Sequence, residues 1–323
     1  MHDPAGAAGV GFWDDDVTTS NIPATAAARS DASAHILMVL AVAIFGLNYV
    51  VGRWAAGQVP PYTLGFTRWT MGALILLPFA LAHLRRERAE IAANWKLLAL
   101  AGFLMPFLGA GVAYIALTYT TAINAGVIQI SLPVMVVILS YFFLGERASR
   151  IQWIGAAGAI VGVLYMIARG KLSVLLGLDF NIGDAIMIAC NLGLAGYGIA
   201  VKRLPYRFNP LSLLFIVCAV GALCHLPFFG WEVATGQLPV PGTTALVSLA
   251  FVALFPSVVA ILFWNFAIAR LGPTRAGFYL YLTPVFAAAF AIPLLGESLG
   301  SYHIIGAALI VAGVTVSTRK AKA

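Results

Sequence analysis

The sequence predicts an all-α polytopic membrane protein: ten transmembrane helices arranged as two inverted five-helix repeats around a central cavity. Three observations lead to this fold class. Of the 323 residues, 61% are hydrophobic and only 10% are charged, which is more apolar surface than a water-soluble domain can bury. The apolar residues fall in runs of about 20, the length of helix that crosses the hydrocarbon core of a bilayer. A long stretch of the first half recurs in the second half, which indicates an internal duplication.

The apolar runs follow one another with short polar breaks. Residues 1–30 precede them and are rich in Ala, Gly, Asp, Ser and Thr without an apolar period, so we expect a disordered cytoplasmic tail there. Pro61 and Pro210 each open a run, because proline suits the first position of a helix, where its missing N–H leaves no bond unmade. The expected spans are 34–55, 62–83, 96–118, 122–144, 151–168, 182–202, 210–230, 244–269, 274–295 and 302–318.

The duplication is clearest in one tripeptide. Leu144-Gly145-Glu146 returns as Leu295-Gly296-Glu297, an offset of 151 residues (297 − 146). At the same offset Pro133-Val134 matches Pro284-Val285, and no gap is needed between residues 116 and 163. An ungapped series of identities over this length indicates two copies of one unit within a single membrane domain. The two five-helix repeats are expected over residues 31–170 and 171–319.

Loop charges predict the direction in which the helices cross the membrane. With the N-terminus in the cytoplasm, 15 of the 19 Lys and Arg residues fall on the cytoplasmic side and 3 outside, and Arg68 lies inside the second helix. This bias predicts cytoplasmic N- and C-termini. Five helices separate Glu146 from Glu297, and because five is odd, equivalent segments should cross in opposite directions. Inverted repeats allow two mirrored packings and hence alternating access.

The sequence also argues against several function classes. Cys190, Cys218 and Cys224 lie in apolar runs, and no Cys-x-x-Cys pair or His/Cys cluster is present, so we expect no metal site. No phosphate-binding glycine loop and no Ser/His/Asp arrangement occurs, which argues against ATP hydrolysis, other enzyme activity and a bound cofactor. The net charge of +7 reflects loop charges that orient the helices, and the basic stripe of a nucleic-acid-binding protein is missing.

Several motifs resemble a known transporter family. Phe45-Gly46-Leu47-Asn48-Tyr49 in the first helix, the Leu-Gly-Glu ends of the fourth and ninth helices, and the glycine-rich fifth and tenth helices are similar to those of the drug/metabolite transporter superfamily. Over residues 34–318 the chain looks most like its EamA branch of bacterial ten-helix exporters, and within that branch like the YddG-type amino-acid exporters. The resemblance implies a secondary transporter of the bacterial inner membrane that exports small metabolites, often amino acids, including aromatic or neutral ones.

Polar and aromatic side chains inside the predicted helices are the candidates for binding such a substrate. A polar group in a membrane span is unfavourable unless it faces a partner or a cavity. Amide and hydroxyl groups can bind the amino and carboxyl groups of a substrate, and aromatic faces can hold its side chain or a cation. Packing, or the aromatic belt near the interface, is the alternative for each Tyr and Trp. The candidates are Asn48, Tyr49, Tyr114, Gln129, Asn191, Tyr197, Trp264, Asn265, Tyr279 and Tyr281.

Four prolines are candidate hinges. Pro106 and Pro256 fall in helices 3 and 8, and Pro133 and Pro284 fall in helices 4 and 9. A proline inside a helix removes a hydrogen bond and kinks the axis, so paired kinks are expected to shape a central cavity. Helices 5 and 10 are expected to pack closely through their glycines, which are Gly155, Gly158, Gly162, Gly306 and Gly313.

Arg68 and the two repeated glutamates are candidate gating residues. Arg68 lies about two turns into the second helix. It could pair with Glu297 and help to close the outer side, attract a substrate carboxylate, or extend its guanidinium to the interface. Glu146 is expected to pair in the same way with Lys202 or Arg203 at the cytoplasmic side. The sequence leaves the three roles of Arg68 open.

The expected cargo is zwitterionic or neutral, because no predicted helix carries Asp or Glu at its middle. The same absence argues against an obligatory proton relay through a buried carboxylate. A multidrug or quaternary-cation exporter of the same fold would need such a carboxylate, and a nucleotide-sugar carrier would need a central cluster of Lys and Arg; these are the alternative functions. The sequence does not determine the substrate, the driving force, the resting orientation or the oligomeric state, and a monomer is compatible with it.

Overall fold

A computed structural model describes residues 24–145, 149–171, 173, 181–271 and 279–317. Within these ranges every regular element is helical; η1 and η2 are π-helical and η3 is a 3-10 turn. In chain order the elements are α1 (Ala24–Ala55), α2 (Pro61–Arg86), α3 (Arg88–Ala93), α4 (Trp95–Gly102), η1 (Phe103–Gly111), α5 (Val112–Tyr119), α6 (Ala122–Gln129), α7 (Leu132–Leu144), α8 (Arg150–Ile167), α10 (Ile182–Lys202), α11 (Pro210–Ala234), α12 (Thr243–Leu254), η2 (Phe255–Val259), α13 (Ala260–Leu271), η3 (Leu280–Leu282), α15 (Thr283–Leu295) and α16 (Ser301–Ser317).

The helices follow the predicted spans closely, and α10 has the predicted bounds. α1 differs because it begins at Ala24, so the expectation of disorder is wrong for residues 24–30, whose high Ala content favours helix. The rest of the expected tail lies outside the described residues. By length and composition, seven described helical stretches can cross a membrane, or eight if the bent pair α6–α7 is one span. Two further apolar helices, Leu280–Leu295 and Ser301–Val316, are shorter.

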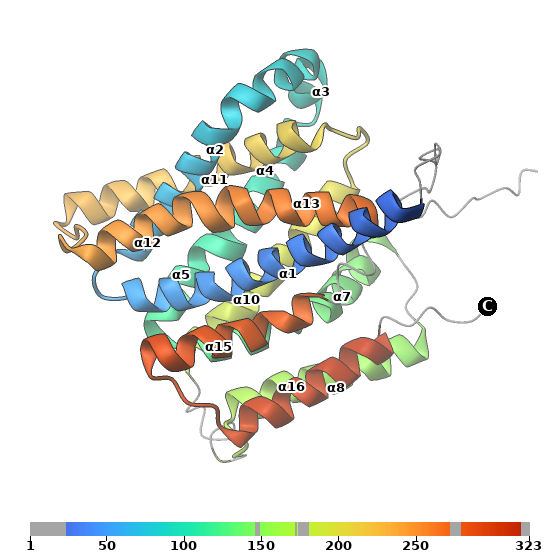
Figure 1. The fold of residues 1–323 in the computed structure, drawn as a ribbon, viewed down its shortest axis with the longest axis vertical. Coiled ribbons are helices and arrows are strands. Elements are labelled where there is room, and N and C mark those ends of the chain that lie inside the picture. Colours follow the sequence, from blue (N-terminus) through green and yellow to red (C-terminus); the bar gives the residue numbers. More distant parts are fainter. Residues whose placement is uncertain (1–23, 146–148, 172, 174–180, 272–278, 318–323) are drawn as a thin grey trace, which may run out of the picture.

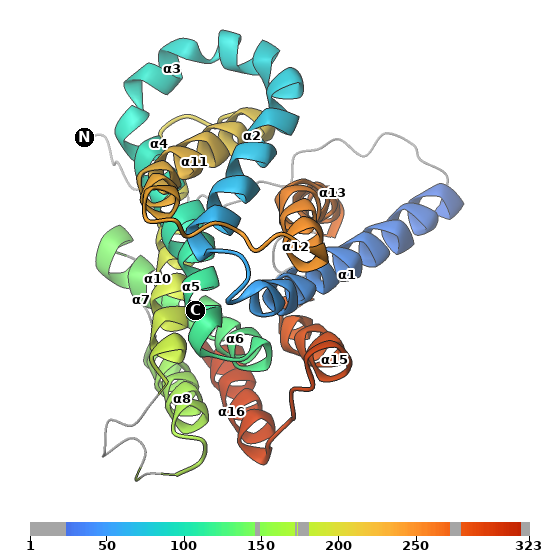
Figure 2. The same cartoon turned by 90° about the vertical axis from the view of Figure 1, so that its left-hand side faces the viewer.

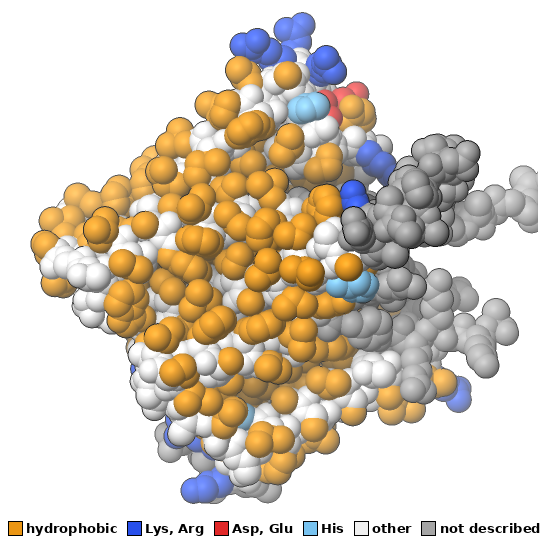
Figure 3. Space-filling view, in the orientation of Figure 1, with side chains coloured by type: hydrophobic (Ala, Val, Ile, Leu, Met, Phe, Trp, Pro, Cys, Tyr) orange, Lys and Arg blue, Asp and Glu red, His pale blue; other side chains and the backbone are white. Residues whose placement is uncertain are grey.

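The helical bundle has two ends, which we name after residues that lie there. The Pro60 end holds the α1–α2 turn, the end of α11 and the starts of α6 and α10. The Glu87 end holds the α2–α3 turn, the start of α11 and the end of α10. Apolar side chains cover the broad face of the molecule, whereas Lys and Arg gather at its margins (Figure 3). This surface is suited to contact with the hydrocarbon of a bilayer.

A few helix pairs define the arrangement. α2 packs along α11, and α8 packs along α16 at one edge of the molecule (Figure 1). α1 packs mainly against α13 and α15, whereas α10 packs mainly against η1, α5 and α7 (Figure 2). The first helix of each predicted repeat therefore makes its main contacts with the third and fourth helices of the other repeat.

Carboxylates hold the ends of α2 and α11 together. Glu232, near the end of α11, accepts the N–H groups of Tyr62 and Thr63 at 2.9 and 2.7 Å, which caps the first turn of α2. Glu87, directly after α2, accepts the N–H of Asn209 at the start of α11 at 2.8 Å. A carboxylate at a helix N-terminus satisfies free N–H groups and interacts favourably with the positive end of the helix dipole. Each helix of this pair thus caps its partner.

The glycines of α8 and α16 serve close helix packing, as the sequence predicts, and the structure shows that these two helices pack against each other. A Cβ atom at position 313 would lie 2.3 Å from the Ala159 nitrogen, and one at position 162 would lie 2.8 Å from the Ile310 nitrogen. Real Cβ atoms do not approach other atoms so closely, so glycine at Gly162 and Gly313 is what permits this backbone separation.

Pro106 and Pro256 lie in the π-helical segments η1 and η2, where the sequence predicts kinks. Pro256 lacks the N–H that would bond the Val252 carbonyl, and Ser257 Oγ donates to that carbonyl at 2.6 Å instead. The freed backbone group is thus satisfied inside the protein. π-Helical turns inside longer helices are frequent at functional sites.

Pro133 and Pro284 lie at the start of a helix rather than in its middle. Each is the second residue of its helix, α7 or α15, where a missing N–H is not needed. The bend comes before Pro133, since the axes of α6 and α7 meet at 44° across residues 130–131. The fourth predicted span is therefore kinked as expected, with the bend directly before Pro133, whereas Pro284 follows the 3-10 turn η3.

The α8–α16 contact gives a stability prediction. Gly313→Ala should lower the free energy of unfolding by about 1–3 kcal/mol, because the added methyl group overpacks the helix interface. Gly198→Ala in α10 is the matched control: a Cβ there meets nothing within 4 Å, so this change should be neutral or stabilise by about 0.5–1 kcal/mol. Thermal unfolding in detergent measures both variants. Equal transition temperatures for the two would contradict the glycine-dependent contact.

Candidate functional site

Arg68 lies inside the bundle and is only 6% exposed. Its Nη1 donates to the Tyr114 hydroxyl at 3.2 Å, and its guanidinium carbon lies 4.6 Å from the centroid of the Trp69 ring. Its Nε is buried without a hydrogen-bond partner. In the part of the chain that the structure describes, no carboxylate forms an ion pair with it. A buried guanidinium in this state is unfavourable unless a ligand supplies the negative charge.

A hydrogen-bonded chain runs from Arg68 to α1. Tyr114, on α5, is 1% exposed and donates its hydroxyl to Asn48 Oδ1 at 2.9 Å. Gly52 allows this close approach, since a Cβ there would lie 2.9 Å from the Tyr114 ring. α1, α2 and α5 therefore each contribute one polar side chain to a single network, which contains a cation, a hydroxyl and an amide.

Tyr49 and Gln129 form a second polar pair beside this network. Tyr49, the neighbour of Asn48 on α1, donates to Gln129 Oε1 at 2.6 Å, and both side chains are half-buried. Gln129 is the last residue of α6, directly before the 44° bend. The pair joins α1 to the point where the fourth predicted span changes direction.

Asn191, on α10, contacts the bend itself. Its Nδ2 donates to the Ile128 carbonyl at 2.8 Å and to Ser131 Oγ at 3.2 Å. The side chain is fully buried, and its Oδ1 has no partner. Asn191 therefore stabilises the bend with its amino group and leaves one acceptor atom available.

The other predicted substrate residues lie apart from this network. Tyr197 packs in an apolar cluster between α4, α10 and α11. Trp264 and Tyr279 pack against the cluster built on Ala34 and Met38, where the Tyr279 hydroxyl is hydrogen-bonded to His35. Tyr281 packs against the main core, and the side chain of Asn265 lies outside the described residues. Of the ten candidates, the structure brings together Asn48, Tyr49, Tyr114 and Gln129, with Asn191 beside them on the α6–α7 bend.

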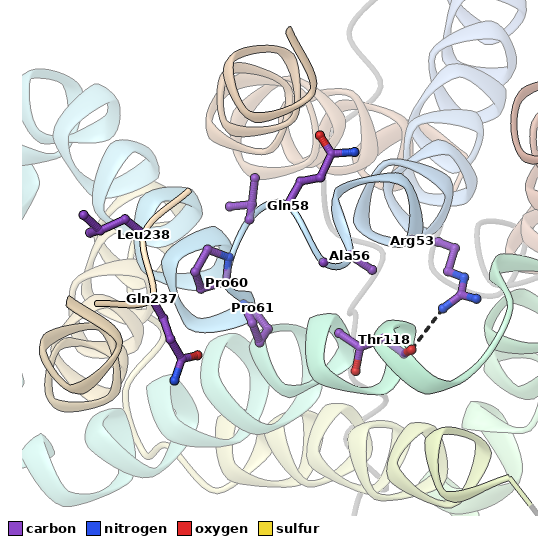
Figure 4. Close-up of a pocket in the computed structure, with 10 residues that line it drawn as sticks. Arg53, Ala56, Gln58, Pro60, Pro61, Thr118, Gln237 and Leu238 are labelled. Atoms are coloured by element: carbon purple, nitrogen blue, oxygen red, sulfur yellow. Dashed lines mark hydrogen bonds between the residues drawn. The ribbon is translucent and has the colours of Figure 1, made fainter. Parts of the chain in front are cut away.

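A pocket of about 710 Å³ opens at the Pro60 end (Figure 4). Arg53 Nη1 donates to the carbonyls of Leu117 and Thr118 at 2.8 and 3.1 Å on one side of it. Arg53 and Thr118 lie four residues beyond Tyr49 and Tyr114, so the network is about 6 Å deeper in the bundle than the pocket. The pocket contains no predicted substrate residue. It is lined by Arg53, Ala56, Gly57, Gln58, Val59, Pro60, Pro61, Thr118, Gln237 and Leu238.

Glu297 caps a helix rather than pairing with Arg68. Its Oε1 accepts the N–H of Ala122 at 2.9 Å and its Oε2 accepts that of Ile123 at 3.1 Å, at the first turn of α6. The predicted Arg68–Glu297 ion pair is therefore wrong in this structure, and so is the extension of Arg68 to the interface, because Arg68 is buried.

The expected cytoplasmic counterpart of this pair is not described in full. Glu146 lies outside the described residues. Arg203, one of its two expected partners, donates to the Phe143 carbonyl at the end of α7.

Sequence reasoning did not connect three buried polar residues at the Pro60 end. Asp184, Asn124 and His303 lie on different helices and are joined by hydrogen bonds. Each falls in the first turn of a predicted span that begins at this end, and this shared depth is the signal that could have revealed the cluster. Glu87 and Glu232 were also missed, although an acidic residue at the end of both the second and the seventh helix is visible in the sequence.

Comparisons with known proteins agree on the class of the chain. The model of the EamA-like transporter family matches residues 32–168 and again residues 181–319. The uncharacterized transporter YyaM of Bacillus subtilis is 24% identical over 87% of this chain and 92% of the relative. A probable amino-acid metabolite efflux pump of Escherichia coli is 25% identical over 87% of this chain and 93% of the relative. One solved crystal structure, 22% identical, matches 89% of this chain and 97% of that chain with a TM-score of 0.53, which shows a shared fold.

The Glu297 cap predicts a local effect on α6. Glu297→Ala should leave two N–H groups without acceptors and weaken the helix start by about 1 kcal/mol, or about fivefold in the opening equilibrium. Hydrogen exchange measured by mass spectrometry should therefore speed up in the Ala122–Gln129 segment. Glu297→Gln, which keeps one acceptor oxygen, should have a smaller effect, and Glu90→Ala on α3 should have none there. Unchanged α6 exchange in Glu297→Ala would rule out the cap.

Proposed function

Because the chain belongs to the EamA-like transporter family of the drug/metabolite transporter superfamily, we propose that it exports amino acids or closely related metabolites from a bacterial cytoplasm by alternating access. It is a multi-pass membrane protein and a transporter by family. The Escherichia coli relative, a probable amino-acid metabolite efflux pump, supports the choice of amino-acid cargo, and the chemistry around Arg68 supports it independently.

The proposed architecture is ten transmembrane helices in two inverted repeats, residues 31–170 and 171–319. The double match of one family model supports the duplication. α1 and α10 each pack against helices of the other repeat, and α2 and α11 cap each other. A two-fold axis in the membrane plane would produce both arrangements. Leu280–Leu295 and Ser301–Val316 would be the two shorter spans.

We assign the Glu87 end to the cytoplasm and the Pro60 end to the outside. Most Lys and Arg residues fall in loops at the Glu87 end, as the positive-inside rule requires of the cytoplasmic face. This orientation puts both chain termini in the cytoplasm of a bacterial inner membrane and makes the pocket beside Arg53 an outer vestibule.

The unpaired, buried guanidinium of Arg68 is the single observation that carries the cargo assignment. An amino-acid carboxylate supplies the missing negative charge, and the planar guanidinium with its free Nε suits the two oxygens of a carboxylate. Asn48 Oδ1 and Gln129 Oε1 are acceptors for the ammonium group. A zwitterion at this position brings no net charge into the bundle.

The alternative cargoes fit this site less well. A quaternary cation would meet Arg68 without a described carboxylate to neutralise it, which is unfavourable in a low-dielectric interior. A nucleotide sugar carries two phosphates, whereas Arg68 is a single buried cation in this network. The π-helical segments at Pro106 and Pro256, together with the α6–α7 bend, are the proposed hinges between the two access states.

A transport assay tests this proposal. Purified protein in proteoliposomes should move labelled amino acids but not organic cations. Arg68→Gln should reduce transport roughly 10- to 100-fold, because a hydrogen bond to a charged group is worth about 1.5–3 kcal/mol. Arg88→Gln on the exposed start of α3 is the charge-matched control and should transport normally. Movement of organic cations alone, or full activity in Arg68→Gln, would overturn the assignment.

A further inference from the structure

A cluster of buried polar side chains joins four helices at the Pro60 end. Asp184, the third residue of α10, is 2% exposed and accepts hydrogen bonds from the Thr120 hydroxyl and from Asn124 Nδ2, the latter at 3.1 and 3.2 Å to its two oxygens. Asn124 Oδ1 in turn bonds His303 Nε2 on α16 at 2.8 Å. Thr120 follows α5 and Asn124 lies on α6, so the cluster connects both predicted repeats.

The hydrogen bonds define the protonation state of this cluster. The Gly300 N–H donates to His303 Nδ1 at 2.9 Å, so that nitrogen carries no proton and Nε2 must be the donor to Asn124. His303 is therefore neutral. Among the described residues, the hydrogen-bond partners of the Asp184 side chain are all uncharged donors, and a carboxylate buried among neutral groups gains stability by binding a proton.

Among the described residues, few charged side chains lie near the cluster. The charge of Arg169, which follows α8, acts on Asp184 without a hydrogen bond to it. Glu297 lies at the start of α6, where its two carboxylate oxygens accept the N–H groups of Ala122 and Ile123. Two uncharged titratable side chains lie on the adjoining elements: Tyr302, whose ring centroid is 4.1 Å from that of His303 in a tilted arrangement, and Tyr119 at the end of α5.

α6 connects this cluster to the Arg68 site. The helix has eight residues, a length of about 12 Å. Its start is held by Glu297 and, through Asn124, by Asp184 and His303. Its end carries Gln129, bonded to Tyr49, and Ile128, bonded to Asn191. A short rigid helix fixed at both ends transmits a change at one end to the other.

We propose that Asp184 is a proton-binding site and that α6 couples its protonation to the substrate site, so that transport is linked to proton movement. The coupling rests on the proposed function; proton binding does not. Within the described part of the chain Asp184 Oδ2 accepts only from Asn124 Nδ2, so a proton on this oxygen turns it into a donor and removes one of the two Asn124 contacts. The hold of α10 on the start of α6 is then weaker, and α6 can move.

This proposal revises the expectation drawn from the sequence, which looked for a carboxylate only at the middle of a helix. Asp184 lies in the first turn of α10, yet the end of α5 and the start of α6 pack against it and leave it only 2% exposed. The tertiary packing, and not the position along the helix, determines this burial.

Infrared titration tests proton binding without any substrate. Purified protein in detergent should show a carboxylic acid C=O band that grows as the pH is lowered. We expect Asp184→Asn to lack this band and Glu87→Gln, which removes a buried carboxylate at the opposite end, to keep it. A pH-difference spectrum that is the same in Asp184→Asn as in the unaltered protein would overturn the proton site.

Coupling is tested in proteoliposomes that contain a pH-sensitive dye. The unaltered protein should move protons when a transported amino acid is added, and Asp184→Asn should carry the amino acid with this proton flux lost. An equal proton flux per amino acid in both proteins would overturn the coupling. If no amino acid is transported by the unaltered protein, the proposed function fails while the infrared result still decides proton binding.

Discussion

A guanidinium buried among apolar helices requires a negative charge nearby, and the described interior of this protein offers Arg68 none. Tyr114 and the Trp69 ring stabilise it in part, through a hydroxyl acceptor and a π-face. The negative charge that is still missing beside Arg68 makes the site complementary to an anion. The adjacent amide oxygens of Asn48 and Gln129 make it complementary to a zwitterion. Under the proposed function, this one unfavourable placement of charge gives the site both its affinity and its selectivity for an amino acid.

Carboxylates at helix starts organise the rest of the bundle. Glu87 and Glu232 fasten the two ends of the α2–α11 pair, and Arg68 is held on one helix of that pair. Glu297 fastens the start of α6, whose other end meets the site through Gln129. The α2–α11 pair is therefore braced at both ends, whereas α6 is a short helix followed by a bend, which suits it to move relative to that frame.

Much of the fold follows from the sequence, because it depends on local properties. Apolar run length predicts the bounds of α10 and most other helices, and the glycines of α8 and α16 predict that these helices pack closely. Asn48, Tyr49, Tyr114 and Gln129 were identified as polar groups in apolar runs and do meet. The partners of Glu297 and Arg68 were not predictable, because a charge can be satisfied by another charge, a helix start or a ligand, and only tertiary packing decides among them. Asp184 was not singled out because it lies in the first turn of its helix, and its burial depends on tertiary packing.

The most direct test of the central claim compares two ligands that differ only in the carboxylate. Binding of an exported amino acid and of its decarboxylated amine should be measured by calorimetry with the unaltered protein and with Arg68→Gln. We expect the unaltered protein to prefer the amino acid by roughly 10-fold or more, and the variant to lose this preference. An undiminished preference in Arg68→Gln would contradict carboxylate binding at Arg68.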